Sequence, residues 1–457
     1  MPNLTLTFSL ADYQTAVTAG RYAPPDAICP YYDVDPVLYR KHGTTDHRRG
    51  KLTEALVELR KRTGRDYFWK TYPLQARTLD YSARTFPAYR FILPEVMTED
   101  WLAIMDWGKF QRDHVLHQPL CGYVVLKLLD GDGASDPLCL PGGITILDAC
   151  VDRILRWEGT AYIRNFLLGC GMREHDPLFH ARSPIARNVW RIFFREAAYV
   201  AAVFHDLGYP WQYAERLQCN LDGMNAPVLK QNRSATQVVD QFSHRLVFDA
   251  LRGYQKEDAA CPSNWRDRIT LITDTALSSS HGLPGALGFL HLNDCVRRYP
   301  SLAQSPLHLL CVEWVAAAIM MHDMSKIYWG KGVPGTGIPE NLFLRLNFDR
   351  DPLSAIVTLV DLIQDFERPA VSYGYVGGGD ERVTLNYDKA CSATELELDA
   401  SGMLIVRYIM STHQDCARKS MYLAKDSHEY FDTHHGYLDM SSLGINEVRL
   451  LVKLQQP

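Results

Sequence analysis

The stretch at residues 194–211 constrains the fold of this chain more than any other. An apolar helical segment, FREAAYVAAVF, ends in the pair His205-Asp206 and is followed by a Gly-Tyr-Pro stop. Adjacent side chains on a helix point about 100° apart, so this pair can contact one ion from two sides or two neighbouring ions. A buried imidazole and carboxylate without partners would be costly. The stretch therefore predicts a buried helix that ends at a metal site.

Other histidines and aspartates stand at the ends or in the middle of apolar segments elsewhere in the chain. A lone histidine beside an apolar run is more often a hydrogen-bonded core or surface residue, so the metal hypothesis rests on their joint occurrence. Imidazole with carboxylate suits first-row transition metals better than magnesium, and facing helices of a bundle can assemble such ligands. The predicted metal ligands are His117, His205, Asp206, His281, His322 and Asp361.

Three alternatives stay open within this set. His114 and His117 are one helical turn apart, and the apolar run that continues directly from His117 favours the second. The pair His322-Asp323 is a second candidate for the defining His-Asp pair. Asp361 lies in the middle of an apolar segment, where a salt bridge to Arg368 is the alternative to a metal.

The spacing of apolar residues predicts a mainly α protein. We expect helices over residues 51–62, 98–129, one or two within 145–195, and then 194–206, 236–256, 263–280, 278–290, 307–323 and 352–368. After about residue 370 the pattern is of the β type at 382–387, 396–398, 403–410 and 448–454, with a polar helical insert at 413–435. The predicted organisation is a mostly helical N-terminal extension (1–100), a helical metal-binding domain (101–370) and a small α+β C-terminal region (371–457).

Composition excludes some classes of partner. The 457 residues carry a formal net charge of -5 without a dense Lys/Arg run, which argues against nucleic acid or an anionic membrane as the main partner. A small anionic substrate is compatible, because a local metal charge can outweigh the global balance. The 11 Cys are odd in number and contain no CxxC, as in a chain with reduced thiols. With no leader-like N-terminus and no apolar run of about 20 residues, we expect a cytoplasmic protein.

The order His, His-Asp, His, His, Asp on successive helices resembles the HD-domain superfamily of metal-dependent phosphohydrolases. The five-element version occurs in cyclic-nucleotide phosphodiesterases and HD-GYP-type proteins, which hold two metals. His281 stands in the His-Gly-x-x-Gly-Ala setting often seen in the superfamily, and the segment DLIQDFERP from Asp361 onward is similar to the one after the last ligand in some bacterial members. The resemblance covers roughly residues 105–370 and implies an HD-domain helical bundle.

The resemblance also implies a reaction, the hydrolysis of a phosphate ester such as a nucleotide or phosphodiester. Two divalent ions (iron, manganese, nickel or zinc, with magnesium less favoured) about 3.5–4 Å apart would share Asp206 and activate a water. One ion would take His117, His205 and Asp361, and the other His281 and His322. Besides Asp206, the implied catalytic candidates are Lys326, Arg368 and Tyr209, for which surface or pairing roles are the ordinary alternative. Tyr209 stands where many members have Lys.

Two other functions fit the same ligand set. Some HD-fold proteins, similar to inositol oxygenase, use a mixed-valent di-iron pair to activate O₂. An HD scaffold can also serve as a non-catalytic nucleotide-binding or interaction module. The ligands alone do not separate these three functions.

Overall fold

A computed structural model describes residues 4–18, 117–131, 136–206, 208, 235–253, 265–297, 306–325, 345–366, 369–376, 380–389, 391–432 and 436–455. Over these ranges the chain forms twelve α-helices and a small sheet built mostly from its C-terminal part, so the predicted mainly α class is confirmed. No helix among the described residues is long and apolar enough to cross a membrane. The helix predicted at 51–62 and the first part of the one at 98–129 lie outside the described residues.

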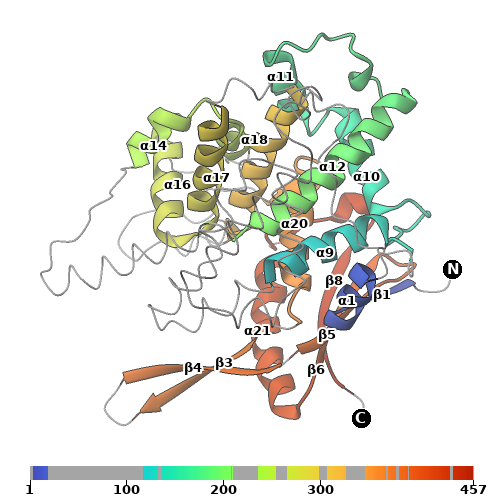
Figure 1. The fold of residues 1–457 in the computed structure, drawn as a ribbon, viewed down its shortest axis with the longest axis vertical. Coiled ribbons are helices and arrows are strands. Elements are labelled where there is room, and N and C mark those ends of the chain that lie inside the picture. The colour runs from blue at the N-terminus through green and yellow to red at the C-terminus, as the bar shows by residue number, and fades with distance from the viewer. Residues whose placement is uncertain are drawn as a thin grey trace, which may run out of the picture.

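Helix α12 (Pro184–Phe204) is the centre of the helical body (Figure 1). Ser183 caps its N-terminus by accepting a hydrogen bond from the N–H of Ala186, and Pro184 fits the first turn, where no N–H partner is needed. The helix is buried without interruption from Glu196 to Phe204. It packs against four helices, α9 (His117–Asp130), α10 (Ile146–Arg156), α18 (Pro306–Met321) and α20 (Pro352–Ile363).

A second group of helices extends this body around α18. It consists of α11 (Ala161–Gly169), α14 (Ala235–Phe242), α15 (Leu246–Gly253), α16 (Trp265–Ser279) and α17 (Gly282–Arg297). The single helix predicted at 236–256 is wrong, because the chain turns at residues 243–245. There Arg245 pairs with the buried carboxylate of Glu313, which also accepts the N–H of Leu246 at 3.2 Å and so caps α15.

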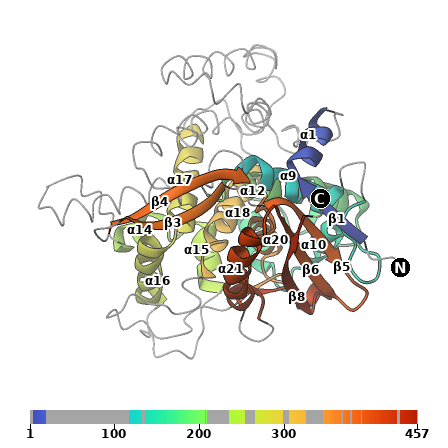
Figure 2. The same ribbon diagram turned by 90° about the horizontal axis from the view of Figure 1, so that it is seen from below.

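The sheet joins the two ends of the chain. Its strand order is β1-β5-β6-β8, with β1 (Leu4–Ser9) antiparallel to β5 (Cys391–Leu398), β5 antiparallel to β6 (Met403–Met410), and β6 parallel to β8 (Glu447–Leu454). Helix α21 (His413–Phe431) makes the parallel crossover and packs on β8 (Figure 2). The segment predicted as the start of a helical extension is therefore a strand of the C-terminal sheet, followed by α1 (Leu10–Thr18).

Two smaller pairs of strands complete the described part. Strand β2 (Leu346–Asn347) pairs in parallel with β7 (Leu438–Asp439) and ties the helical body to the C-terminal region. Strands β3 (Pro369–Val376) and β4 (Asp380–Lys389) form an antiparallel hairpin that extends away from the sheet in Figure 1.

Helix α20 ends at Ile363, five residues before the predicted end at 368. Gln364 adopts an extended conformation (φ -79°, ψ 91°), while its N–H still donates to the carbonyl of Val360. The Gln364 side chain is fully buried and donates to the carbonyl of Phe366 at 2.7 Å. This local hydrogen bonding competes with helix continuation, so the helix stops at Ile363.

Candidate metal centre

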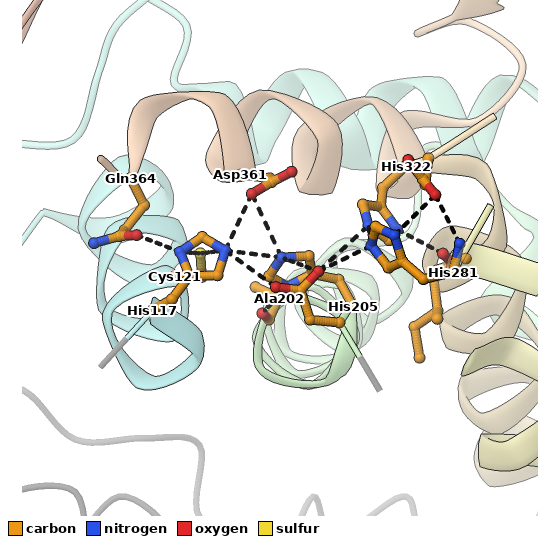
Figure 3. A network of polar contacts seen from close by, with 12 residues as sticks. His117, Cys121, Ala202, His205, His281, His322, Asp361 and Gln364 are labelled. Atoms are coloured by element: carbon orange, nitrogen blue, oxygen red, sulfur yellow. Dashed lines mark hydrogen bonds and ion pairs between the residues drawn. The ribbon is translucent and has the colours of Figure 1, made fainter. Parts of the chain in front are cut away.

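The six predicted ligands lie at the ends of helices that meet beside α20 (Figure 3). His117 is the first residue of α9, and His205-Asp206 directly follow α12. His281 directly precedes α17, and His322 directly follows α18. Asp361 stands in the last turn of α20. The structure thus brings all six residues into one cluster.

Glycines allow α12 and α17 to approach each other at this cluster. A Cβ atom added to Gly208 would lie 1.8 Å from the carbonyl oxygen of His281, and one added to Gly285 would lie 2.9 Å from the backbone nitrogen of Gly208. Only glycine leaves room for such backbone contact. Because the two backbones touch, the Asp206 carboxylate at the end of α12 reaches the imidazole that precedes α17.

His117, His205 and Asp361 form the first triad. Nε2 of His117 lies 3.1 Å from Nε2 of His205 and 3.1 Å from Oδ1 of Asp361. Nε2 of His205 lies 3.5 Å from the same Oδ1 atom. Both histidines are buried, whereas the side chain of Asp361 is 32% exposed and opens this triad to solvent.

Asp206, His281 and His322 form the second triad. Nε2 of His281 lies 3.0 Å from Nε2 of His322 and 3.0 Å from Oδ1 of Asp206, while His322 is 3.8 Å from that oxygen. The other oxygen of Asp206, Oδ2, lies 3.5 Å from Nε2 of His117. Oδ1 of Asp206 also lies 3.3 Å from Nε2 of His205, so the Asp206 carboxylate stands between the two triads and contacts histidines of both.

All four histidines turn Nδ1 toward an oxygen atom. A donor at Nδ1 leaves the lone pair at Nε2 for another partner. The Nε2 atoms face one another in pairs, so two lone pairs would repel unless a cation lies beside them. Such outer hydrogen bonds commonly orient metal-binding histidines. The Nδ1 partners are Gln364 Oε1 for His117, the Ala202 carbonyl for His205, the Ile319 carbonyl for His322 and Asp323 Oδ2 for His281.

The carboxylates set the pKa values of the buried histidines. Burial disfavours the charged imidazole of His205, but Asp206 and Asp361 together outweigh it and hold the pKa of His205 well above its usual range. Burial acts on His281 too, yet Asp323 and Asp206 together raise the pKa of His281 to about 9. Burial and the neighbouring imidazoles lower the pKa of His322 to about 4. The centre attracts positive charge, so protons and metal cations compete for it.

The spacing of these atoms suits a metal ion. Two ligands each about 2.1 Å from one ion, at angles between tetrahedral and octahedral, lie about 3.0–3.4 Å apart. The contacts within the triads, from 3.0 to 3.8 Å, are close to this range. Overlapping buried groups of His and Asp in this cluster could therefore hold a metal ion. Imidazole and carboxylate donors together suit first-row transition metals.

The roles of three residues of the centre escaped the sequence analysis, although Asp323 was named there as part of the alternative His-Asp pair. Gln364 and Asp323 orient His117 and His281, and only their spacing hinted at this: Gln364 follows Asp361 by about one helical turn, and Asp323 follows a ligand directly. Cys121, one of the cysteines expected to be reduced, is buried one turn after His117 with Sγ 3.6 Å and 3.7 Å from the two ring nitrogens. It could add a thiol donor beside the first triad.

Four residues considered from the sequence lie outside the described residues: His114, Tyr209, Lys326 and Arg368. Their roles stay predictions. Asp323, the second residue of the alternative His-Asp pair, is described, and its carboxylate contacts His281 rather than the other ligands' Nε2 atoms.

The C-terminal region supports both ligand helices from outside. The hydroxyl of Tyr437 donates to the carbonyl of Met321 at 2.6 Å, directly before His322. The hydroxyl of Tyr408 on β6 donates to the carbonyl of Leu362 at 2.7 Å, directly after Asp361. Carbonyls in the last turn of a helix lack the usual i+4 partners; Tyr408 bonds one such carbonyl of α20, and Tyr437 adds a second hydrogen bond to the Met321 carbonyl, which also accepts the N–H of Met324 at 3.2 Å.

No family model, no curated protein and no solved structure matches this chain.

Proposed function

We propose that this protein is a metal-dependent phosphohydrolase, similar to the HD superfamily, that hydrolyses a phosphate ester at a centre of two metal ions. One observation carries the proposal: two His/Asp triads adjoin, and the carboxylate of Asp206 contacts histidines of both. Their order along the chain is the one that the resemblance requires. A nucleotide or phosphodiester is the substrate class that the resemblance favours.

In this proposal the chain's own residues hold and orient the reacting groups. His117, His205 and Asp361 would hold one ion, and Asp206, His281 and His322 the other. Two such ions supply an activated water and stabilise the charge on the attacked phosphorus.

The charge balance of the centre favours an anionic substrate. Two divalent cations with two ligand carboxylates leave a net positive charge, which attracts phosphate even in an acidic protein. The partly exposed Asp361 marks the side from which the substrate approaches. Lys326 and Arg368 are proposed to contact the phosphate or to protonate the leaving oxygen.

Elemental analysis of the purified full chain, joined to a screen of nucleotides and phosphodiesters, tests the proposal. His205→Ala and Asp206→Ala should each lose bound metal and hydrolysis while the protein stays folded. His175→Ala is the matched control, since His175 is an exposed histidine away from the cluster. Full metal content in both centre variants would refute the ligand assignment.

The same preparation separates the two other functions. A mixed-valent iron signal in electron paramagnetic resonance, with O₂ consumption, would favour an oxygenase. A metal-loaded protein that binds nucleotides without turning any over would favour a non-catalytic module.

A further inference from the structure

Asp323 directly follows the predicted ligand His322 in the sequence, but its carboxylate contacts another predicted ligand, His281, which precedes α17. Its Oδ2 atom accepts the backbone N–H of His281 at 2.8 Å and lies 2.9 Å from Nδ1 of the same residue. Asp323 is only 6% exposed, so water does not screen this contact. One carboxylate oxygen thus holds the backbone of His281 by a hydrogen bond and lies within ion-pair distance of its ring.

The other three histidines have neutral Nδ1 partners. His117 contacts the amide oxygen of Gln364, and the remaining two contact backbone carbonyls in the preceding helical turn. A carboxylate behind an imidazole makes Nε2 a stronger donor to a metal than a neutral oxygen does. His281 of the second triad is therefore the one described ligand histidine with a carboxylate behind its ring.

The two triads also differ in their exposure to water. His281, His322 and Asp206 are 6%, 3% and 3% exposed, whereas the Asp361 side chain of the first triad is 32% exposed. Water competes for an exposed carboxylate and weakens its attraction to a cation. The burial of Asp206, compared with the partly exposed Asp361, and the charge of Asp323 behind His281 therefore favour cation binding at the second triad.

We propose that Asp323 is a positioning residue that makes Asp206, His281 and His322 the tighter of two metal subsites. The triad of His117, His205 and Asp361 is the weaker subsite and exchanges its ion with solvent. The inference rests on the proposed two-ion centre but not on the reaction. It implies that the ion at the second triad stays bound, and that the availability of the ion for the first triad controls activity.

Calorimetric titration of the metal-free full chain with Zn²⁺, against a competing chelator, tests the inference. The wild-type protein should show two classes of site with unequal affinity. Asp323→Asn keeps an oxygen for the backbone N–H of His281 but removes the charge, and should weaken the tighter class about 10–100-fold. The weaker class should keep its affinity. Wild-type affinities in Asp323→Asn would overturn the proposal.

Gln364→Leu is the matched control, because the side-chain oxygen of Gln364 faces Nδ1 of His117 as that of Asp323 faces Nδ1 of His281. It should weaken the weaker class and leave the tighter one. A merely structural role for either residue would instead lower both classes together, and that result would overturn the proposal.

Asp361→Asn tests the assignment without touching Asp323. It should abolish the weaker class and spare the tighter one, and loss of the tighter class would contradict the proposal. So would a single class of equal sites in the wild-type protein. Unequal binding without hydrolysis would refute the proposed function alone, whereas hydrolysis with equal binding would refute this inference alone.

Discussion

The contact between Gly208 and His281 gives a sharp test of how the centre is assembled. In a Gly208→Ala variant the new Cβ atom would lie 1.8 Å from the His281 carbonyl, whereas real Cβ contacts stay above 3.0 Å. The two backbones must separate by at least 1.2 Å (3.0 minus 1.8) along this contact. Overpacking of this kind costs about 1–3 kcal/mol or more. The same displacement would pull Asp206 away from His281, 3.0 Å apart in the native centre.

Gly288→Ala is the control, since Gly288 lies inside the same α17 and an added Cβ there would meet nothing within 4 Å. It should stabilise the helix by about 0.5–1 kcal/mol. Thermal unfolding of the metal-free proteins and the metal content per chain are the measurements. We expect Gly208→Ala to unfold at a lower temperature and to lose the ion at the second triad. Equal melting temperature and metal content in the two variants would refute the assembly described here.

Three further predictions concern the centre and its surroundings. Because the pKa of His281 is raised to about 9, a proton occupies it below that pH, and metal affinity should fall by up to about tenfold per unit as pH decreases from 9; a pH-independent affinity would contradict this. Tyr437→Phe removes the donor to the Met321 carbonyl and should cost about 1 kcal/mol in urea unfolding, since the Met324 N–H still bonds that carbonyl. Lys326→Ala should lower the rate of hydrolysis while metal content is kept; loss of metal would assign Lys326 a structural role.

Much of the helical architecture follows from the sequence because apolar spacing and helix signals agree. The helix before His205 and the one before His322 end where their apolar runs end. The strands at 403–410 and 447–454 follow from alternation and β-branched residues. The pairing of β1 with β5 could not be predicted, since nearly 400 residues separate the two strands and nothing local to 4–9 specifies its partner. The break at residues 243–245 depends on Glu313, which lies 67 residues beyond Leu246 in the sequence and is likewise not local to the break.

Some residues of the candidate site could likewise be predicted from the sequence, and others could not. A residue that is costly to bury, such as Asp361 in an apolar helix, can be predicted as a site residue from the sequence. The roles of residues that act through another residue are not visible in the sequence: Gln364 looks like an ordinary polar position, and Asp323 looks like a possible ligand, until the fold places them behind His117 and His281. The early end of α20 belongs to this group, because the tertiary contacts of Gln364 stop the helix.

Anomalous X-ray diffraction from crystals of the metal-loaded full chain, recorded at the absorption edge of the bound element, tests the central claim most directly. The account predicts two peaks, one among His117, His205 and Asp361 and one among Asp206, His281 and His322. No peak within this cluster, or a peak bound by other residues, would contradict it.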